Sequence, residues 1–447
     1  MGDLASIVKA YDIRGVVPDQ LDEGVAEAVG AAFARVTGAG TIVTMHDMRT
    51  SSAPLAEAFG RGAAAQGADV LAGGLASTDM LYYASGDLGI PGAMITASHN
   101  PSRYNGIKLC RAGAKPVGIA TGLAEIKELA ERATDPAPVP GTVTRRDLLP
   151  GYAEHLRKLV DISSIRPLTV AVDAGNGMAG HTVPKVFDGL PVTLIPLYFD
   201  LDGTFPNHEA NPIDPENLRD LQRAVTEHHA DIGLAFDGDA DRCFVVDERG
   251  EPVSPSVITA LIATRELARE PGATIIHNLI TSRAVPEIVT ANGGVPVRTR
   301  VGHSFIKAKM AECGAVFGGE HSGHFYFRDF WFADSGMLAA LHTLAALGEQ
   351  PLPLSQLLAR YARYVASGEI NSEVADQAAS TEQVRRVFAG RPGVSTDELD
   401  GLTVSTATWW FNLRPSNTEP LLRLNVEADA EATMVSLRDE VLGVVRG

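Results

Sequence analysis

The sequence predicts an α/β protein built from three related α/β domains and a smaller C-terminal α+β domain. The chain has 447 residues, which is too long for one hydrophobic core and corresponds to about three or four domains of ordinary size. A pattern of strand, polar turn and helix occurs three times, and such alternation is typical of parallel sheets that helices cover on both faces. The last part, from about residue 365, lacks this pattern.

Composition indicates a soluble globular protein of the reducing cytoplasm. Hydrophobic residues make up 45% and charged residues 21% of the chain. The net charge of −17 disfavours nucleic acid or an anionic membrane as a partner. Cys110, Cys243 and Cys313 are odd in number and far apart, which argues against a disulfide scaffold. Neither a secretory leader nor an apolar run of membrane-spanning length is expected.

Each repeat begins with a short apolar strand, followed by a polar turn and a helix. The predicted strands are Thr41–Met45, Leu168–Val172 and Thr274–Ile276, with Val192–Ile195 and Val295–Val297 closing the second and third repeats. The first helix is capped by Ser51 or Ser52 and ends near Gly67, and the third spans about Ser282–Ala291. Before the first repeat, Lys9–Gly15 is expected to form a strand and turn with an exposed Arg14, and a helix then runs to about Val36.

Proline and charged residues accumulate at three places that we take as domain boundaries: Asp135–Pro140, Asp247–Pro252 and Ala362–Glu369. The predicted domains are residues 1–147, 148–250, 251–364 and 365–447. The last contains two apolar strands around Arg414–Pro420 and a closing amphipathic helix from about Glu431.

A serine loop follows the apolar run Ala93–Ile95, which is expected to be the end of a buried strand. The strand stops in the sequence Thr96-Ala97-Ser98-His99-Asn100-Pro101, where proline cannot continue a ladder. Ser98 is therefore predicted at a strand end, where α/β proteins place their chemistry, and it is a candidate nucleophile. An ordinary Ser-Asn-Pro turn is the alternative.

Three carboxylates at alternate positions, Asp237, Asp239 and Asp241, follow the apolar strand Ile232–Phe236. They would repel one another on a tight loop unless a hard cation lay among them, and oxygen ligands suit Mg²⁺. Arg242 beside the metal would suit phosphoryl oxygens. A solvated acidic turn is the alternative reading of this loop.

The segment Gly175–Gly180 is a literal G-x-G-x-x-G after a strand, with Asp200 ending the next strand. This is the dinucleotide fingerprint, and an NAD-dependent enzyme is its implication. The following helix is short and contains Pro184, and a second mononucleotide half is missing. We therefore favour a tight strand-to-helix turn over a nucleotide site.

Two later loops carry hydrogen-bonding groups. Gly318–His324 holds donors and acceptors for sugar hydroxyls, and Arg414–Pro420 offers a guanidinium, hydroxyls and an amide suited to a phosphate. Gly302-His303 begins a predicted helix at about Ser304–Ala311, whose N-terminus would attract an anion. Each of these loops by itself is also compatible with a structural turn.

Taken in order, these motifs resemble those of the α-D-phosphohexomutase family, the phosphomannomutases and phosphoglucomutases. The resemblance extends over nearly the whole chain, from Tyr11–Gly15 to Arg414–Pro420. It implies four domains around one central cleft: three related α/β domains with mixed sheets and a smaller α+β domain at the C-terminus. It also implies reversible phosphoryl transfer between C1 and C6 of a hexose phosphate, through a phosphoserine and a hexose 1,6-bisphosphate that serves as intermediate and activator.

The resemblance also implies roles for individual residues. Ser98 would carry the phosphoryl group, and with Asp237, Asp239 and Asp241 it would hold Mg²⁺. Arg14, Lys108 and Arg242 would lie close to that group. Tyr11, Glu320 and Ser322 would contact the sugar. The non-reacting phosphate would be bound by Arg414, Ser416, Asn417 and Thr418.

Within the family, His321 and Asn417 resemble the mannose and glucose enzymes more than the phosphoglucosamine mutases. One departure concerns the general acid/base, because Ile280 stands where some relatives have lysine. Lys108, His303 and His324 are the candidates for that role.

We expect a phosphomannomutase or phosphoglucomutase that acts on a small phosphosugar as a monomer or weak homo-oligomer. Three alternatives are a phosphoglucosamine mutase, a Mg²⁺-dependent sugar-phosphate phosphatase that uses the same Ser98, and a sugar-phosphate or nucleotide binder without catalysis.

Overall fold

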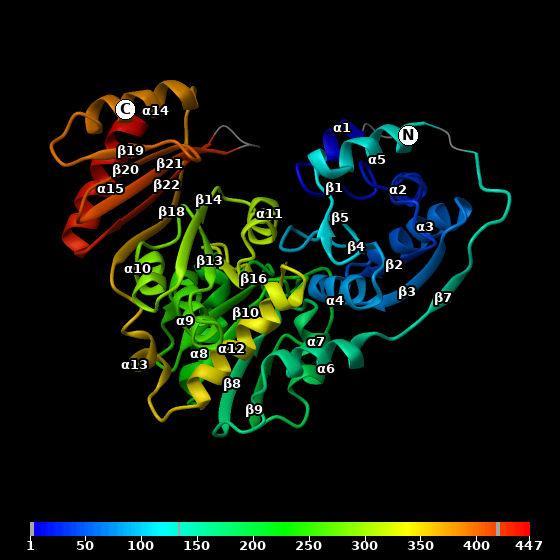
Figure 1. Ribbon diagram of the computed structural model, residues 1–447, viewed down its shortest axis with the longest axis horizontal. Helices are drawn as coiled ribbons and strands as arrows, with labels where there is room; N and C mark the ends of the chain where they lie inside the picture. Colours follow the sequence, from blue (N-terminus) through cyan, green and yellow to red (C-terminus); the bar gives the residue numbers. More distant parts are fainter. Residues whose placement is uncertain (1–3, 133–134, 417–420) are drawn as a thin grey trace.

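The computed structural model contains four β-sheets that follow one another along the chain (Figure 1). It describes residues 4–132, 135–416 and 421–447, and only the backbone of residues 303 and 304. In this part of the chain, no helix is long and apolar enough to cross a membrane.

The first sheet has the order β1-β5-β4-β2-β3-β7, and β6 pairs with β5. Its strands are β1 (Ile13–Val16), β2 (Thr41–His46), β3 (Asp69–Leu75), β4 (Gly92–Ile95), β5 (Tyr104–Arg111), β6 (Lys115–Pro116) and β7 (Val143–Arg145). Its helices are α1 (Leu4–Ile7), α2 (Glu23–Thr37), α3 (Ser52–Ala65), α4 (Thr78–Leu88) and α5 (Leu123–Ala130). The strands β4, β2, β3 and β7 run parallel, whereas β5 is antiparallel to β1 and to β4.

The second sheet has the order β12-β11-β10-β8-β9. Its elements are α6 (Leu149–Leu159), β8 (Leu168–Asp173), α7 (Ala179–Phe187), β9 (Val192–Leu197), α8 (Arg219–Glu227), β10 (Ile232–Phe236), β11 (Cys243–Asp247) and β12 (Pro252–Val253). Val170 and Val172 pack on the α7 side, and Ala171 between them packs on the α8 side. Helices therefore cover both faces, as the repeat pattern predicts.

The third sheet has the order β14-β13-β15-β16-β17. Its elements are α9 (Pro255–Arg269), β13 (Thr274–Asn278), α10 (Ala284–Ala291), β14 (Val295–Thr299), α11 (His303–Cys313), β15 (Phe317–Gly319), β16 (Phe325–Phe327), β17 (Ala333–Asp334), α12 (Gly336–Gly348) and α13 (Leu354–Leu358). The three sheets share one plan, a parallel centre with antiparallel strands along one edge. They are therefore mixed sheets, as the family resemblance implies, and not the wholly parallel sheets that the strand–helix alternation predicts, because antiparallel strands complete one edge of each.

The fourth sheet is antiparallel throughout and has the order β18-β22-β21-β20-β19. Its elements are β18 (Val365–Glu373), α14 (Gln377–Phe388), β19 (Ser395–Asp397), β20 (Leu402–Ser405), β21 (Trp409–Pro415), β22 (Leu421–Ala428) and α15 (Glu431–Arg446). This arrangement confirms the α+β class predicted for the last domain. In Figure 1 the domain lies at one end of the molecule, across from the first sheet.

One apolar cluster runs through the first three sheets, including Met45 of β2, Val170 of β8, Ile275 of β13 and much of α12. The fourth sheet has its own cluster under α14 and α15. A small apolar cluster joins the fourth sheet to the third, where Trp410 of β21 packs with Leu279 and Ile280, and polar contacts such as the Arg298–Asp397 ion pair lie beside it. The first three sheets are thus packed more extensively on one another than on the fourth.

Candidate active site

Ser98 lies directly after β4, as predicted, and its side chain faces the second domain. The residue is 4% exposed, and its backbone is left-handed with φ of 51°, which is uncommon for a residue with a side chain. Its N–H donates to Thr96 Oγ1 at 2.9 Å, which fixes the turn locally. Its Oγ donates to Asp237 Oδ2 at 2.7 Å, although the two residues are 139 positions apart.

The three carboxylates of the acidic loop converge as the sequence predicts. Asp237, Asp239 and Asp241 lie between β10 and β11, are almost completely buried, and present oxygen atoms within 4.8 Å of one another. Asp239 Oδ1 and Asp241 Oδ1 are buried and accept no hydrogen bond among the described residues. Buried carboxylate oxygens without a donor are costly, and a hard cation would satisfy them. The donor set therefore fits Mg²⁺.

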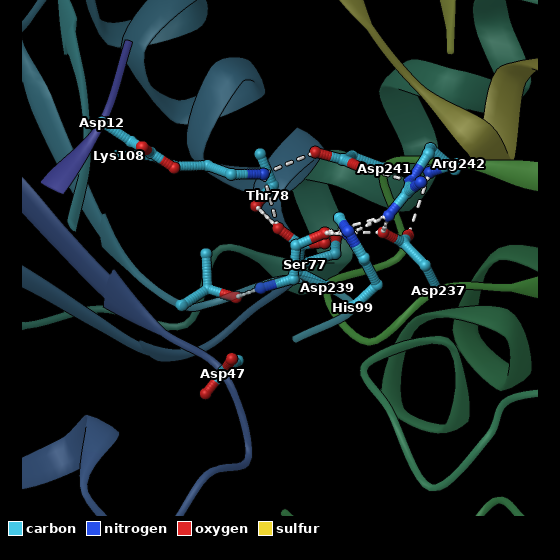
Figure 2. A network of polar contacts seen from close by, with 12 residues as sticks. Asp12, Asp47, Ser77, Thr78, His99, Lys108, Asp237, Asp239, Asp241 and Arg242 are labelled. Carbon is cyan, nitrogen blue, oxygen red and sulfur yellow. Dashed lines mark hydrogen bonds and ion pairs between the residues drawn. The ribbon is translucent and has the colours of Figure 1, made fainter. Parts of the chain in front are cut away.

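Cationic and hydroxyl groups surround the carboxylates (Figure 2). Lys108 Nζ lies 2.7 Å from both Asp239 Oδ2 and Asp241 Oδ2. Arg242 forms a 2.9 Å ion pair with Asp237, and Thr78 Oγ1 donates to Asp239 Oδ2 at 2.6 Å. The acidic loop is thus not a solvated turn but a buried charge cluster between the first and second domains.

Charge pairing determines the ionisation of this cluster. Burial alone would lower the pKa of Lys108, but Asp239 and Asp241 outweigh it and raise that pKa. Burial alone would likewise raise the pKa of Asp239, but the charge and hydrogen bond of Lys108 lower it. Lys108 is therefore a fixed cation in this arrangement, which suits charge neutralisation better than proton transfer.

A cavity of about 190 Å³ opens beside Ser98. It is bounded by the first three domains, and its lining includes Tyr11, Arg14, Ser98, Lys108, Arg242 and His324. Arg14 is half-buried, not exposed as predicted, because Asp12 Oδ2 accepts from it at 2.6 Å and Asn100 also accepts from it. Tyr11 contacts Phe305 of α11 edge-on at 6.3 Å between ring centroids. The cavity thus places three cationic side chains near the serine hydroxyl, with the carboxylates of Asp12, Asp241 and Asp334 in the same lining.

His324 lines the same cavity from the third domain. Asp334 Oδ2 lies 2.9 Å from its Nδ1, and Lys307 Nζ lies 2.6 Å from the other oxygen of Asp334. Burial opposes protonation of His324, but Asp241 and Asp334 outweigh it and raise its pKa. Nδ1 is thereby oriented and Nε2 is left for a substrate, an arrangement suited to proton transfer. The side chain of His303, the other candidate histidine, lies outside the described residues.

The sugar loop joins β15 to β16. Glu320 is 2% exposed, and its carboxylate accepts from Tyr326 Oη at 2.6 Å, from the N–H of Gly302 at 3.2 Å and from Asn278 at 3.3 Å. It therefore also caps the N-terminus of α11, which the sequence had suggested as an anion site. Ser322 is half-buried at the turn of this loop.

The phosphate loop follows β21 of the fourth domain, and of its described residues neither Arg414 nor Ser416 lines the Ser98 cavity. Arg414 is on β21, and its Nη2 donates to Glu369 Oε2 at 2.7 Å. The Ser416 N–H donates to the carbonyl of Leu421 at 2.8 Å. Asn417 and Thr418 lie outside the described residues. The structure therefore brings together the serine, metal and His324 groups, whereas Arg414 and Ser416, the described members of the phosphate loop, do not line their cavity.

Two residues of the cluster were not predicted from the sequence. His99 Nδ1 lies 3.2 Å from Ser98 Oγ and also contacts Arg242, and burial together with Arg242 lowers the pKa of His99 well below its usual range. The neutral ring is thus a further polar contact of the serine. Thr78, at the start of α4, carries no local signal, because its contact with Asp239 crosses between domains. His99 was visible within the Thr96–Pro101 motif.

In the glycine-rich turn Gly175–Gly180, the backbone N–H groups are used in hydrogen bonds within the protein. Four successive N–H groups of the turn donate within the protein. That of Gly175 donates to Asp173 Oδ1, and that of Asn176 to the carbonyl of Tyr198. The next two, of Gly177 and Met178, donate to the carbonyls of Ala174 and Gly238. A Cβ at Gly177 would lie 2.7 Å from the carbonyl oxygen of Gly238. These N–H groups already donate within the protein, and the segment forms a tight strand-to-helix turn that packs against the acidic loop.

Comparisons with known proteins cover nearly the whole chain. Four models of the phosphoglucomutase/phosphomannomutase family match: alpha/beta/alpha domain I at residues 5–136, domain II at 150–250, domain III at 254–364 and the C-terminal domain at 369–444. A phosphomannomutase of Escherichia coli is 41% identical over 98% of both chains. A protein of Xanthomonas campestris described as phosphohexose mutases is 41% identical over 98% of this chain and 99% of its own.

A solved structure of a phosphoglucomutase/phosphomannomutase family protein from Burkholderia thailandensis has a TM-score of 0.90 and 34% identity, and covers 100% of this chain and 98% of its own. The N-acetylphosphoglucosamine mutase of Aspergillus fumigatus, solved in complex with GlcNAc-6P and magnesium, has a TM-score of 0.65, 14% identity, and coverage of 99% and 96%. The second likeness concerns the fold alone. Full-length matches, the order of the four domain models and the site geometry agree, and the chain belongs to the phosphoglucomutase/phosphomannomutase family.

Proposed function

We propose that this protein is a phosphohexose mutase that interconverts the 1-phosphate and 6-phosphate of mannose, and also accepts glucose phosphates. The observation that carries the proposal is the 2.7 Å contact of Ser98 Oγ with Asp237, inside a cavity lined by Arg14, Lys108 and Arg242. A serine placed among buried cations and carboxylates suits the storage and transfer of a phosphoryl group.

In the proposed reaction the bond between Ser98 Oγ and phosphorus breaks while a bond forms from phosphorus to the free hydroxyl of the hexose phosphate. The proton of that hydroxyl passes to His324, which Asp334 orients at 2.9 Å. The resulting hexose 1,6-bisphosphate turns over, and its other phosphoryl group returns to Ser98 while the proton returns to the sugar. Because the phosphoryl group never meets water, it is not lost between the two transfers.

The chain's own residues supply most of the stabilisation. Arg14, Lys108 and Arg242 neutralise the charge of the transferring group, since such transfers depend on positioning and electrostatics. Asp237, Asp239 and Asp241, with the phosphorylated Ser98, would hold Mg²⁺, which when bound would neutralise further charge on the phosphoryl oxygens.

The remaining binding roles extend this proposal to the other loops. Tyr11, Glu320 and Ser322 contact the sugar, and Arg414, Ser416, Asn417 and Thr418 bind the phosphate that does not react. Arg414 does not line the Ser98 cavity here, and we propose that the fourth domain approaches this cavity when substrate binds. A guanidinium recognises phosphate oxygens and not the carbon that bears them, so one arginine serves both substrate orientations.

We further propose that the enzyme is cytoplasmic, works as a monomer or weak homo-oligomer, and requires a hexose 1,6-bisphosphate as activator. The four functional domains are taken as residues 1–147, 148–250, 251–364 and 365–447. Mannose is favoured over glucosamine because the full-length relatives at about 40% identity include phosphomannomutases, and because His321 and Asn417 match the mannose and glucose pattern.

Coupled assays on mannose 1-phosphate, glucose 1-phosphate and glucosamine 1-phosphate test this function. We expect the highest kcat/KM for mannose 1-phosphate, a lower value for glucose 1-phosphate, and at least a tenfold lower value for glucosamine 1-phosphate. Release of inorganic phosphate should be negligible. Stoichiometric release would instead identify a phosphatase, and a glucosamine preference would identify a phosphoglucosamine mutase.

A further inference from the structure

The carbonyl oxygens of the serine loop converge on one buried guanidinium, that of Arg49. Its Nη2 donates to the carbonyls of Ser98 at 2.9 Å and Asn100 at 2.6 Å, and its Nη1 to those of Pro101 and Tyr104 at 3.0 Å each. Buried carbonyls need donors, and a loop cannot obtain them from a sheet ladder. Here one side chain provides four of these hydrogen bonds.

Arg49 is itself held by a buried counter-ion. Its Nε lies 3.3 Å from Asp47 Oδ2, and both side chains are almost completely buried. The other oxygen, Asp47 Oδ1, accepts from the N–H of Arg49 at 3.0 Å and from Ser52 Oγ at 2.5 Å. Asp47 lies apart from the three carboxylates of the acidic loop (Figure 2). It therefore fixes the guanidinium and takes no part in the metal-ligand set.

The second domain closes over the same guanidinium. The ring of Phe205 lies 5.0 Å from Arg49 Cζ, and a Cβ at Gly203 would lie only 2.5 Å from Arg49 Cα. The Ser98 carbonyl is also bounded by Gly238, because a Cβ there would lie 2.5 Å from it. Arg49 thus links the serine loop to the domain that carries the acidic loop.

We propose that Arg49 is a positioning residue that fixes Ser98 Oγ against Asp237, with Asp47 as its counter-ion and Phe205 as its cover. The inference rests on the proposed role of Ser98 as the phosphoryl carrier. Lysine keeps the charge but lacks the planar fork, so it cannot hold four carbonyls at once. Loss of the fork lets the left-handed Ser98 turn relax, and a displacement of about 1 Å at a reacting atom lowers turnover about 100-fold.

The test compares Arg49→Lys, Phe205→Leu and the control Arg103→Lys. Arg103 lies on the same loop, but its side chain is exposed and faces the ring of Tyr104. For each variant, kcat and KM are measured on mannose 1-phosphate, and mass spectrometry follows the rate of Ser98 phosphorylation by a hexose 1,6-bisphosphate. The activity of each variant is divided by the amount of protein whose Ser98 becomes phosphorylated at the end of the reaction. Unfolded protein is not phosphorylated and therefore does not enter the comparison.

We expect Arg49→Lys to lower kcat and the phosphorylation rate by about 10- to 100-fold with KM changed less than threefold, because the sugar-binding residues are elsewhere. Phe205→Leu should lower kcat about three- to tenfold, and Arg103→Lys should leave it unchanged. A native kcat per folded site in Arg49→Lys, or in Phe205→Leu if Arg49→Lys does not fold, would overturn the inference. A Ser98→Ala protein that keeps turnover would instead overturn the proposed function, whatever Arg49 does.

Discussion

At the residue scale, the main parts of the candidate site were predictable because strand ends collect at one edge of a sheet. Ser98 follows β4 and Asp237 follows β10, and the sequence placed both at strand ends. The partners of the site were harder to predict. Thr78 makes its contact with Asp239 across domains, and it belongs to no local motif. Such contacts depend on how the domains pack, which a single sequence does not encode locally.

The unpartnered oxygens of the acidic loop lead to a prediction about metal dependence. Asp239→Asn removes one charge from the ligand set while keeping the shape of the side chain. We expect kcat to fall at least 100-fold and the Mg²⁺ concentration for half-maximal activity to rise at least tenfold. Mg²⁺ titration of the activity after treatment with EDTA provides the measurement.

Asp439→Asn is the matched control, because Asp439 is an exposed carboxylate on α15 paired with Arg438. It should leave both quantities unchanged. An unaltered Mg²⁺ dependence in Asp239→Asn, or native activity in excess EDTA, would contradict the metal assignment.

At the element scale, the starts of strands that are flanked by turn residues were predicted within one or two residues, as β2, β8, β10 and β13 show. Several elements were not predicted, and for β5 and α12 the physical reason is clear. β5 contains Asn105-Gly106, a pair typical of turns, and Asn105 is instead buried and donates to Ser51 and Ser52. α12 is buried along its whole length, so it has no polar face from which a helical period is visible.

The glycine-rich turn before α7 gives a prediction that separates packing from nucleotide binding. Gly177→Ala places a methyl group 2.7 Å from the carbonyl oxygen and 2.9 Å from the Cα of Gly238, in the acidic loop. We expect a loss of stability of about 1–3 kcal/mol, as for an overpacked core, together with a loss of activity. Thermal unfolding and kcat measure the two effects.

Gly443→Ala in α15 is the control, since a methyl group there meets nothing within 4 Å and should not destabilise. Addition of NAD, NADP or FAD should leave the melting temperatures of the Gly177→Ala and Gly443→Ala proteins unchanged. A saturable shift with any of them would revive the dinucleotide reading of Gly175–Gly180.

At the scale of the whole molecule, the sequence predicted four units but not how they pack. The first three share one apolar cluster, whereas the fourth meets the third in a small contact that includes Ile280 and Trp410. Ile280 is thus part of a contact between domains in this chain. This packing could not be derived from strand and helix periods, which describe one element at a time.

Asp79 joins the first three domains through its buried carboxyl group. It accepts from Ser77 of its own domain, from Tyr152 Oη at 2.7 Å and from Ser335 Oγ at 2.6 Å. Burial raises its pKa from 3.8 to about 6, with the three hydroxyl donors opposing this shift. The folded protein therefore binds this proton more tightly than the unfolded chain, and the resulting stability is lost as the pH rises from about 4 through 6.

Comparison with Asp79→Asn, which does not titrate, isolates this effect. We expect the melting temperature of the native protein, relative to that of the variant, to decrease as the pH is raised from 4.5 to 7.5. The decrease corresponds to a loss of about a few kcal/mol at most in the free energy of unfolding. Thermal scans at several pH values provide the measurement. A difference that stays constant with pH, or grows with it, would show that the fold does not raise the pKa of Asp79.

The central claim is that Ser98 carries the phosphoryl group, and the phosphorylation state of active enzyme tests it most directly. Intact-mass and peptide mass spectrometry should find one phosphate, located on Ser98, and an excess of mannose 1-phosphate should remove it as hexose 1,6-bisphosphate. Ser98→Ala should have less than about a thousandth of native turnover while remaining folded. Active enzyme without phosphate at Ser98, or near-native turnover in Ser98→Ala, would contradict the account.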